Sequence, residues 1–454
     1  MKKTTQQLFS LLCLFICISK GNAQESAVAN PQVTLNILDE VLFYDGYAAP
    51  VSAPVPDGVI RHRNDLYATK LSATVLSSIG ASLTMNITIK ASCDNYDRIG
   101  NVNLAFVPKG ATTYNPADVS RIEVGRFITP FMNKNVQPDQ VPYSFAVNNV
   151  AKILRDPYLN SIYDFWVELQ VFGVPYAAQE QIAGCAGRND VFFGSLDFVT
   201  AGTPIGSAAT FLLPLSMIAD FNNYNPNATD AVGTTAKTIS FNLVNAVPNA
   251  KMYLITSNHG SNDGGEEYVR RIHNTFVDNV PNITYTPGGI SCEPFRMYNT
   301  QGNGIYGSSP QTTSWWTEWN NWCPGNEIPI RVLTLGTLAA GNHTFKITVP
   351  DAQFVGGQGN FPLSLYLQGD GQSQLQVANF ERDQFRLYPN PTTGTATVSY
   401  TENVRQVTVN NMMGQKVWTG NTGEIDLSGL APNVYIVNIE FENGQKTVQK
   451  IVKK

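Results

Sequence analysis

Two acidic positions in the sequence could act as acid or base in a hydrolytic reaction. The first is Asp97, which is followed by Arg98 in a stretch rich in Gly and Asn at the mouth of an expected strand. The neighbouring cation would hold the carboxylate ionised, so that it could orient or deprotonate water. A purely structural Asp-Arg pair at the start of the strand is the alternative interpretation.

The second position is a pair of adjacent glutamates, Glu266 and Glu267, which follow the glycine-rich segment 257–265. We expect this loop to lead both residues into a strand. Successive side chains of a strand point to opposite faces, so only one of the two glutamates could face a cleft.

The histidines favour carboxylate chemistry over metal chemistry. His62, His259, His273 and His343 are the only four, and they are scattered over different expected strands and loops. A histidine-ligated metal site would need most of them to converge. The sequence also lacks a Gly-x-Ser-x-Gly elbow and a glycine-rich phosphate loop before a helix. We therefore expect no metal and no other cofactor.

The first 23 residues have the pattern of a secretory signal peptide. Two lysines precede the apolar run 8–18, and Gly21-Asn22-Ala23 resembles a cleavage site. That run is too short to span a bilayer, and no later stretch approaches the ~20 apolar residues required. We expect an exported protein with no transmembrane segment.

Four cysteines remain after the signal peptide, and in an exported chain an even count favours disulfides. Cys292 and Cys323 bracket a polar, aromatic loop and are predicted to form one bridge. Cys93 is then left to pair with Cys185. Nucleic acid is not an expected partner, because the net charge is -5 and no basic cluster could neutralise several phosphates.

The elements that must position these residues are strands. Apolar and polar residues alternate in runs such as 81–89 and 165–171, and again in 238–243 and 343–349. Period-2 runs separated by Gly, Pro and Asn are typical of antiparallel sheets. We predict an all-β protein with two jelly-roll β-sandwich domains packed side by side, residues 32–201 and 202–372.

A compact third unit, residues 384–454, begins near the segment Tyr388-Pro389-Asn390-Pro391 and ends in Lys453-Lys454. It resembles the C-terminal sorting domain of the type IX secretion system of Bacteroidetes, a small immunoglobulin-like β-sandwich. The resemblance implies a secreted or cell-surface protein with the type IX secretion machinery as a partner. An ordinary immunoglobulin-like module that stays attached is the alternative.

Residues 32–370 resemble the peptide:N-glycosidase F family. Segment 125–130 repeats the family's Gly-Arg-Phe-Ile-Thr-Pro, and segment 322–325 repeats its Trp-Cys-Pro-Gly. The resemblance implies two jelly rolls and a monomeric secreted amidase that cleaves between Asn and the innermost N-acetylglucosamine of N-linked glycans. N-glycosylated proteins or glycopeptides would be the substrates.

By this resemblance Asp97 is the principal catalytic aspartate, and Glu267, which precedes Tyr268, is the catalytic glutamate. The remaining matches imply substrate-binding or supporting roles for Arg98, Arg126, His259 and Trp322. Two further positions are expected to bind substrate although the chain departs from the family there: Trp319, where the family has arginine, and Gln170, where the family has a second-rank glutamate. Glu168, two residues earlier on the same face, is an alternative substitute.

Four tryptophans fall within residues 315–322, in a polar loop. Sugars present C–H faces that stack on indole rings, so the cluster suggests a carbohydrate platform, and we predict that Trp322 faces the sugar. Core packing is the alternative. Two other functions stay open at this point: a glycan-binding protein without turnover and a copper-dependent monooxygenase.

Overall fold

The computed structural model describes residues 32–202, 209–221, 231–261, 264–374, 386–399, 404–411, 415–441 and 446–454. The predicted signal peptide, residues 1–23, lies outside the described residues. Within these ranges, no helix is both long and apolar enough to cross a membrane.

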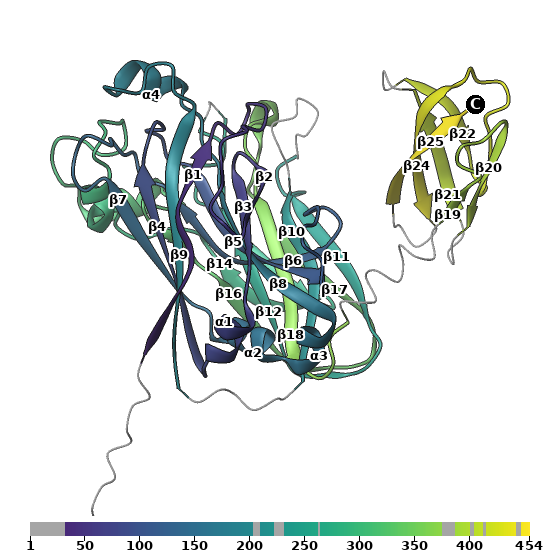
Figure 1. The fold of residues 1–454 in the computed structure, drawn as a ribbon, viewed down its shortest axis with the longest axis horizontal. Helices are drawn as coiled ribbons and strands as arrows, with labels where there is room; N and C mark the ends of the chain where they lie inside the picture. The colour runs from purple at the N-terminus through teal and green to yellow at the C-terminus, as the bar shows by residue number, and fades with distance from the viewer. Residues whose placement is uncertain are drawn as a thin grey trace, which may run out of the picture.

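The first β-sandwich packs a four-stranded sheet, in the order β1-β9-β4-β7, against a six-stranded sheet, in the order β15-β6-β5-β8-β3-β2 (Figure 1). Its strands are β1 (Val33–Tyr44), β2 (Val59–Arg63), β3 (Leu66–Lys70), β4 (Ser82–Ala91), β5 (Ile99–Pro108), β6 (Ser120–Ile128), β7 (Gln140–Ala146), β8 (Tyr163–Val171) and β9 (Asp190–Ala201). Its helices are α1 (Ala73–Ser78), α2 (Asn148–Arg155), α3 (Pro157–Ile162) and α4 (Tyr176–Gln181).

The predicted alternation explains why these strands bury one face. Along β4 every second side chain is fully buried, as at Met85 and Ile87, and packs into the core between the two sheets. Burial of each such side chain contributes about 1.5–3 kcal/mol to folding. The period-2 pattern of residues 81–89 therefore specifies both the strand and the face that it buries.

The second β-sandwich contains two four-stranded sheets, in the orders β10-β18-β12-β16 and β11-β17-β13-β14. Its strands are β10 (Thr210–Asp220), β11 (Ala236–Leu243), β12 (Val247–Thr256), β13 (His273–Val277), β14 (Val280–Tyr285), β16 (Arg331–Leu338), β17 (Gly341–Thr348) and β18 (Pro362–Asp370). The connections carry η1 (Glu293–Tyr298), α5 (Thr313–Trp319), β15 (Glu327–Ile328) and η2 (Val355–Gly357).

The two sandwiches are joined through β6. The short strand β15, which precedes the second sandwich's β16, pairs with β6 of the first sandwich. Next to this pairing, Ile128 packs against Ile255, Ile328 and Trp322. Hydrogen bonding and apolar packing thus hold the two sandwiches side by side.

The C-terminal unit is a smaller sandwich with its own core, in which Val407, Val437 and Ile451 are fully buried. Its sheets have the orders β19-β20-β23 and β22-β21-β24-β25. The strands are β19 (Arg386–Tyr388), β20 (Thr395–Ser399), β21 (Val404–Asn410), β22 (Lys416–Gly420), β23 (Glu424–Asp426), β24 (Asn433–Phe441) and β25 (Lys446–Lys453). The predicted all-β class with two larger sandwiches and a small third one is confirmed.

Both predicted disulfides are present. Cys93, just after β4, is bonded to Cys185, just after α4, and Cys292 at the start of η1 is bonded to Cys323, just after α5. Each bridge fixes a long connecting segment at the end of a sandwich.

Candidate functional site

Asp97 and Glu267 come from different sandwiches and lie close enough for their charges to interact. Asp97 is in the loop between β4 and β5, and Glu267 is in the segment between β12 and β13. Burial raises the pKa of Asp97 to about 7, with a further upward contribution from the negative charge of Glu267. Two like charges in a poorly solvated site resist simultaneous ionisation. The sequence prediction that these two carboxylates share a site is thus reflected in the geometry.

Burial also raises the pKa of Glu267. Two hydrogen bonds act in the opposite direction, because they favour the ionised form. The backbone N–H of Gly260 donates to Glu267 Oε2 at 2.9 Å, and the Tyr268 hydroxyl donates to the same carboxylate. The carboxylate of Glu267 is therefore held in a fixed orientation next to Asp97.

Arg98 favours the ionised form of Asp97 only through its charge, because its direct partner is another carboxylate. Arg98 forms a two-pronged ion pair with Asp94, with Nε to Oδ2 at 2.7 Å and Nη2 to Oδ1 at 3.3 Å. Its charge still lowers the pKa of Asp97, but burial and Glu267 outweigh it. The Oδ2 atom of Asp97 is buried and has no hydrogen-bond partner among the described residues. This oxygen can therefore accept a proton or a hydrogen bond from a bound water or substrate.

The expected strand at Glu266 and Glu267 is also wrong, since residues 264–270 form turns. The side chains of Glu266 and Glu267 nevertheless have different partners, as the strand prediction required. Glu266 is buried and ion-paired with Arg271 at 2.7 Å, and it accepts the backbone N–H of Gln353 at 2.8 Å. Glu266 stabilises the turn, and Glu267 is the residue left for the site.

Arg126 joins the sandwiches and does not reach solvent. It is 0% exposed, and it pairs with Glu123 through Nε at 2.8 Å and Nη2 at 2.7 Å. Its Nη1 atom donates to Ser257 Oγ and to the carbonyl of Pro362 in the second sandwich, both at 2.8 Å. The guanidinium is enclosed by these partners, so its contacts favour the supporting role of Arg126 over substrate binding.

His259 lies at the same junction and is only 8% exposed. Burial and then the charge of Arg126 lower the pKa of His259 to about 3, so the imidazole is neutral at physiological pH. Its Nε2 atom is 2.7 Å from Ser257 Oγ. Because Gly260, the next residue, supplies the N–H to Glu267, the geometry gives His259 a supporting position beside the carboxylates.

The buried and exposed members of the tryptophan cluster differ from the prediction. Trp322 is 8% exposed, packs against Ile128 and Ile255, and donates from Nε1 to the carbonyl of Asn258 at 2.8 Å. Its predicted sugar-facing position is therefore wrong, since core packing accounts for it. Trp316 is fully buried, whereas Trp315 is 36% exposed. Trp319 ends α5, and its side chain lies outside the described residues.

A cleft of about 570 Å³ lies beside the two carboxylates and is lined by both sandwiches. Tyr96, which precedes Asp97, and Tyr268, which follows Glu267, are both in its wall. The other lining residues are aromatic, amide-bearing, glycine or aliphatic, and none is charged: Asn95, Phe131, Gln181, Gln301, Gly302, Asn303, Gly304, Ile305 and Trp315. Aromatic rings and amides without charge are a combination suited to a neutral sugar.

The disulfides hold opposite walls of this cleft. Cys93–Cys185 fixes the segments that carry Asn95 and Gln181, whose side chains are hydrogen-bonded at 2.7 Å. Cys292–Cys323 closes the loop that carries Trp315. The exposed tryptophan of this loop that lines the cleft is Trp315 and not Trp322. Neighbouring residues of a helix point in directions about 100° apart, so a short helix that buries Trp316 turns Trp315 away from the core.

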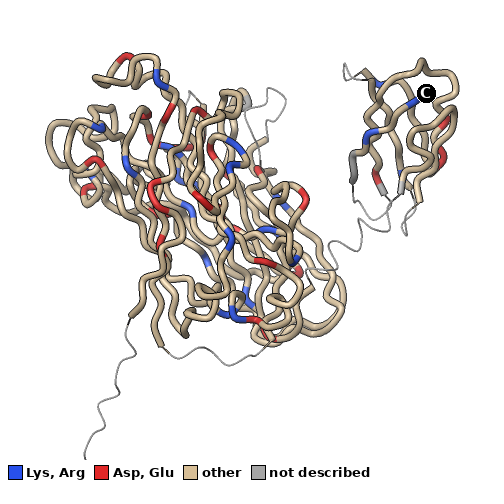
Figure 2. The backbone as a smooth tube through the Cα atoms, in the orientation of Figure 1, with Lys and Arg blue, Asp and Glu red and all other residues tan. Residues whose placement is uncertain are grey.

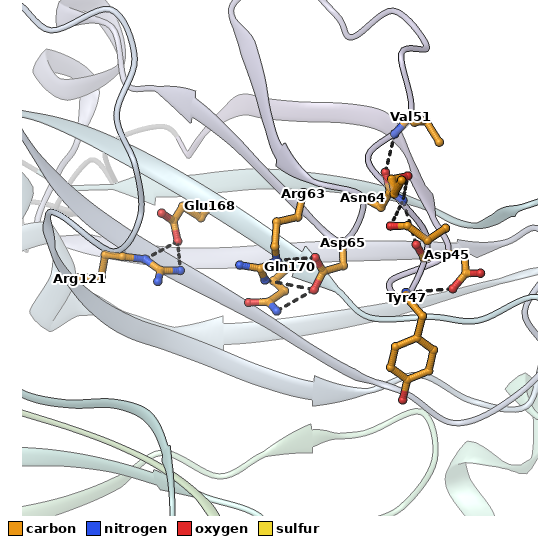
Figure 3. Close-up of polar contacts among 11 residues, drawn as sticks. Asp45, Tyr47, Val51, Arg63, Asn64, Asp65, Arg121, Glu168 and Gln170 are labelled. Carbon is orange, nitrogen blue, oxygen red and sulfur yellow. Dashed lines mark hydrogen bonds and ion pairs between the residues drawn. The ribbon is translucent and has the colours of Figure 1, made fainter. Parts of the chain in front are cut away.

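Gln170 and Glu168 lie on β8 in polar networks of the first sandwich (Figure 3). Gln170 Nε2 donates to Asp65 Oδ2 at 2.9 Å, and Arg63 pairs with the same carboxylate. Glu168 is fully buried and ion-paired with Arg121. Because Tyr114 and Asn103 also donate to it, the carboxylate of Glu168 is fully occupied by structural contacts. Neither residue is among those that line the cleft, and the substrate-binding role of Gln170 stays a prediction.

Comparison with protein-family models gives three matches along the chain. Residues 34–186 match the N-terminal domain of peptide-N-glycosidase F, and residues 223–368 match its C-terminal domain. The chain belongs to the peptide-N-glycosidase F family. Residues 386–454 match the secretion system C-terminal sorting domain. This sorting domain marks the family member for type IX secretion, to the medium or to the cell surface.

The solved structure of PNGF-II shares the fold. PNGF-II is 17% identical with a TM-score of 0.54, and the match covers 74% of this chain and 65% of that one. PNGase F from Flavobacterium meningosepticum, described as a glycosylasparaginase, is 16% identical with a TM-score of 0.44, over 75% of this chain and 96% of that one. The chain thus spans about two thirds of the length of PNGF-II. A search of curated proteins found no match.

Proposed function

We propose that the protein is a secreted peptide-N4-(N-acetyl-β-glucosaminyl)asparagine amidase, which hydrolyses the amide bond between Asn and the innermost sugar of N-linked glycans without a metal. The observation that carries the proposal is the half-buried pair Asp97 and Glu267, whose charges interact beside an uncharged aromatic cleft that both sandwiches line. The family membership gives the class of reaction, and the pair supplies groups able to perform it.

In this mechanism Asp97 acts as the base. Its unpartnered Oδ2 takes a proton from water, and the water oxygen attacks the side-chain carbonyl carbon of the glycosylated Asn. The tetrahedral intermediate breaks its C–N bond, and the leaving nitrogen is protonated as the glycosylamine departs. Glu267, held by Gly260 and Tyr268, hydrogen-bonds the first sugar or supplies that proton. The products are Asp in the polypeptide and a glycan that ends in an amino group.

The experiment is incubation of the purified chain with a denatured N-glycoprotein, followed by mass spectrometry of the released glycan and of the peptide. Glycan release that leaves Asp at the glycosylation site supports the proposal. Glycan binding without release, across several glycoproteins, would identify a binding protein instead and overturn the amidase assignment.

The pH dependence of kcat/KM should follow the ionisation of Asp97. A base must be deprotonated to act, and the pKa of Asp97 is raised to about 7 by burial and by Glu267. We therefore expect kcat/KM to rise about tenfold per pH unit up to pH 7 and to level off above it. A profile that falls as pH rises through 7 would make Asp97 an acid and contradict its role as the base.

Trp315 should contribute to sugar binding, because its ring is exposed and lines the uncharged cleft. Loss of the stacking surface in Trp315→Ala is expected to cost about 1–2 kcal/mol, which raises KM roughly 5- to 30-fold with little change in kcat. The matched control is Tyr47→Ala, which removes an exposed aromatic side chain that does not line the cleft. Steady-state kinetics on a glycopeptide distinguishes the two variants, and equal KM values would remove Trp315 from the binding surface.

A further inference from the structure

A second pocket lies at the seam between the sandwiches, where α2 meets the sheet of β10, β12 and β18. Its volume is about 160 Å³, and its wall combines α2 residues with residues of the second sandwich. Figure 1 shows α2 and α4 at opposite ends of the first sandwich, and α4 carries Gln181 of the cleft. The seam pocket is therefore separate from the carboxylate site.

The charge of the seam pocket is positive. Lys152, Arg155 and Lys251 line it, and Asp370 is its one acidic lining residue, so three positive charges face one negative charge. None of the three cations forms an ion pair with any residue in the described part of the chain. Asp370 instead accepts a hydrogen bond from Asn249 at 2.5 Å. A surplus of two positive charges, in a chain whose net charge is -5, is the feature to be explained.

Another pocket, which adjoins the seam pocket, shows that unpaired positive charge is not a general property of this end of the sandwich. Arg155 also lines a neighbouring pocket together with Lys70 and Lys109. There Asp164 pairs with both lysines, at 3.4 and 3.0 Å. Figure 2 shows basic positions near the α2 end of the first sandwich. The two lysines of the adjoining pocket have a carboxylate partner, whereas Lys152, Arg155 and Lys251 have none among the described residues.

The walls of the seam pocket are held in place before any ligand binds. Arg155 Nη1 donates to the carbonyl of Leu76 at 3.1 Å, which fixes the guanidinium, while its Nε atom is buried without a partner among the described residues. Tyr253 stacks on Tyr366 with ring centroids 4.9 Å apart. Asn149 donates to the Tyr366 hydroxyl at 2.7 Å across the seam. The arginine and the aromatic wall of the pocket therefore lose little conformational freedom on binding.

We propose that the seam pocket binds an oxyanion: a carboxylate, sulfate or phosphate, free or carried on a single sugar ring. An arginine and two lysines that line one pocket without carboxylate partners match the charge of such a group, and charge-assisted hydrogen bonds are the strong ones. An engineered cavity of about 150 Å³ holds a benzene ring, so the volume admits a six-membered ring. The bound anion links α2 to the second sandwich and stabilises the folded chain, since only the folded chain binds it. This proposal does not depend on the amidase activity.

The test is isothermal titration calorimetry and thermal unfolding of the full chain with sodium sulfate, sodium phosphate, glucuronate and N-acetylneuraminate at constant ionic strength. N-acetylglucosamine is the neutral control. We expect saturable binding and a higher Tm with at least one anion and none with the neutral sugar. Tight binding of free sulfate or phosphate would identify an inorganic anion as the ligand, whereas preference for an acidic sugar would identify a glycan.

The double variant Lys152→Met/Lys251→Met should weaken anion binding at least about tenfold, because each lost contact is charge-assisted. The matched control Lys70→Met/Lys109→Met removes two cations from the adjoining pocket and should leave the affinity within about twofold. Unchanged affinity in the first variant, or no anion-dependent rise in Tm in the parent protein, would overturn the proposal. Glycan release should be the same in all three proteins, which separates this result from that of the amidase assay.

Discussion

Asp97→Asn is expected to lower kcat/KM for glycan release by about 10²- to 10⁴-fold, the usual contribution of a positioned general base. The amide has the size of the carboxylate but cannot take a proton from water. Because the residue acts on chemistry rather than on binding, kcat should fall and KM should change little. Steady-state kinetics with a labelled glycopeptide checks this. Full activity in the variant would remove Asp97 from the mechanism.

The same substitution should stabilise the protein at alkaline pH. The pKa of Asp97 in the folded chain is about 7, above its ordinary value of 3.8, so the folded chain binds the proton more tightly than the unfolded chain does. Stability is therefore lost as pH rises from about 4 to 7, by at most about 4 kcal/mol for a shift of roughly three pKa units.

Asp97→Asn removes that loss, so we expect the variant to unfold at a higher denaturant concentration than the parent at pH 8, with a difference that disappears towards pH 4. The exposed carboxylate Asp351 supplies the control, because it lies outside the cleft and Asp351→Asn should leave glycan release unchanged. An Asp97→Asn variant that is both inactive and less stable at pH 8 would show that the substitution damages the fold, and its inactivity would then say nothing of catalysis.

Arg126→Met should be the most destabilising of the substitutions considered. It leaves the buried carboxylate of Glu123 without its cation, and removal of one partner from a buried pair costs about 3–5 kcal/mol. The bonds to Ser257 and Pro362 in the second sandwich are lost with it. We expect a lower urea midpoint and weaker association of the two sandwiches. Equilibrium unfolding followed by tryptophan fluorescence measures both.

The double variant Glu123→Gln/Arg126→Met tests the cause. Glu123→Gln removes the unpaired buried carboxylate, so much of the stability lost in Arg126→Met should return. Ser364, which donates to Glu123, can donate to the glutamine in the same way. The exposed pair Arg405 and Glu440 gives the comparison, since Arg405→Met should cost less than about 1 kcal/mol. If Arg126→Met were as mild as Arg405→Met, Arg126 would not be the structural link between the sandwiches.

The sequence predicted the strands because their buried faces follow a strict period of two, as in β4 and β8. It predicted both disulfides because the chain offers only four cysteines after the signal peptide. Motif matching selected Asp97 and Glu267. The pattern of residue types thus carried the architecture, and the catalytic role of the acidic pair stays a prediction.

Partner choice could not be predicted in the same way. Arg98 follows Asp97 directly, yet its guanidinium pairs with Asp94, four residues earlier, because the loop after β4 turns that carboxylate towards it. Arg126 lies in the most specific motif of the chain, and the motif serves a buried contact between sandwiches rather than the substrate. Which tryptophan of the 315–322 cluster is exposed depends on the residue at which helix α5 begins. Each of these is decided by tertiary contacts that a local pattern does not contain.

The most direct test of the amidase assignment is digestion of an N-glycopeptide in water enriched in heavy oxygen, followed by mass spectrometry of both products. Attack of water on the Asn side-chain carbonyl predicts that one heavy oxygen enters the peptide as the carboxylate of a new Asp, and that the released glycan retains both sugars of its core with no heavy oxygen from the cleavage itself. A peptide that keeps Asn with one attached sugar, and a glycan that carries the heavy oxygen, would show cleavage of a glycosidic bond and contradict the account.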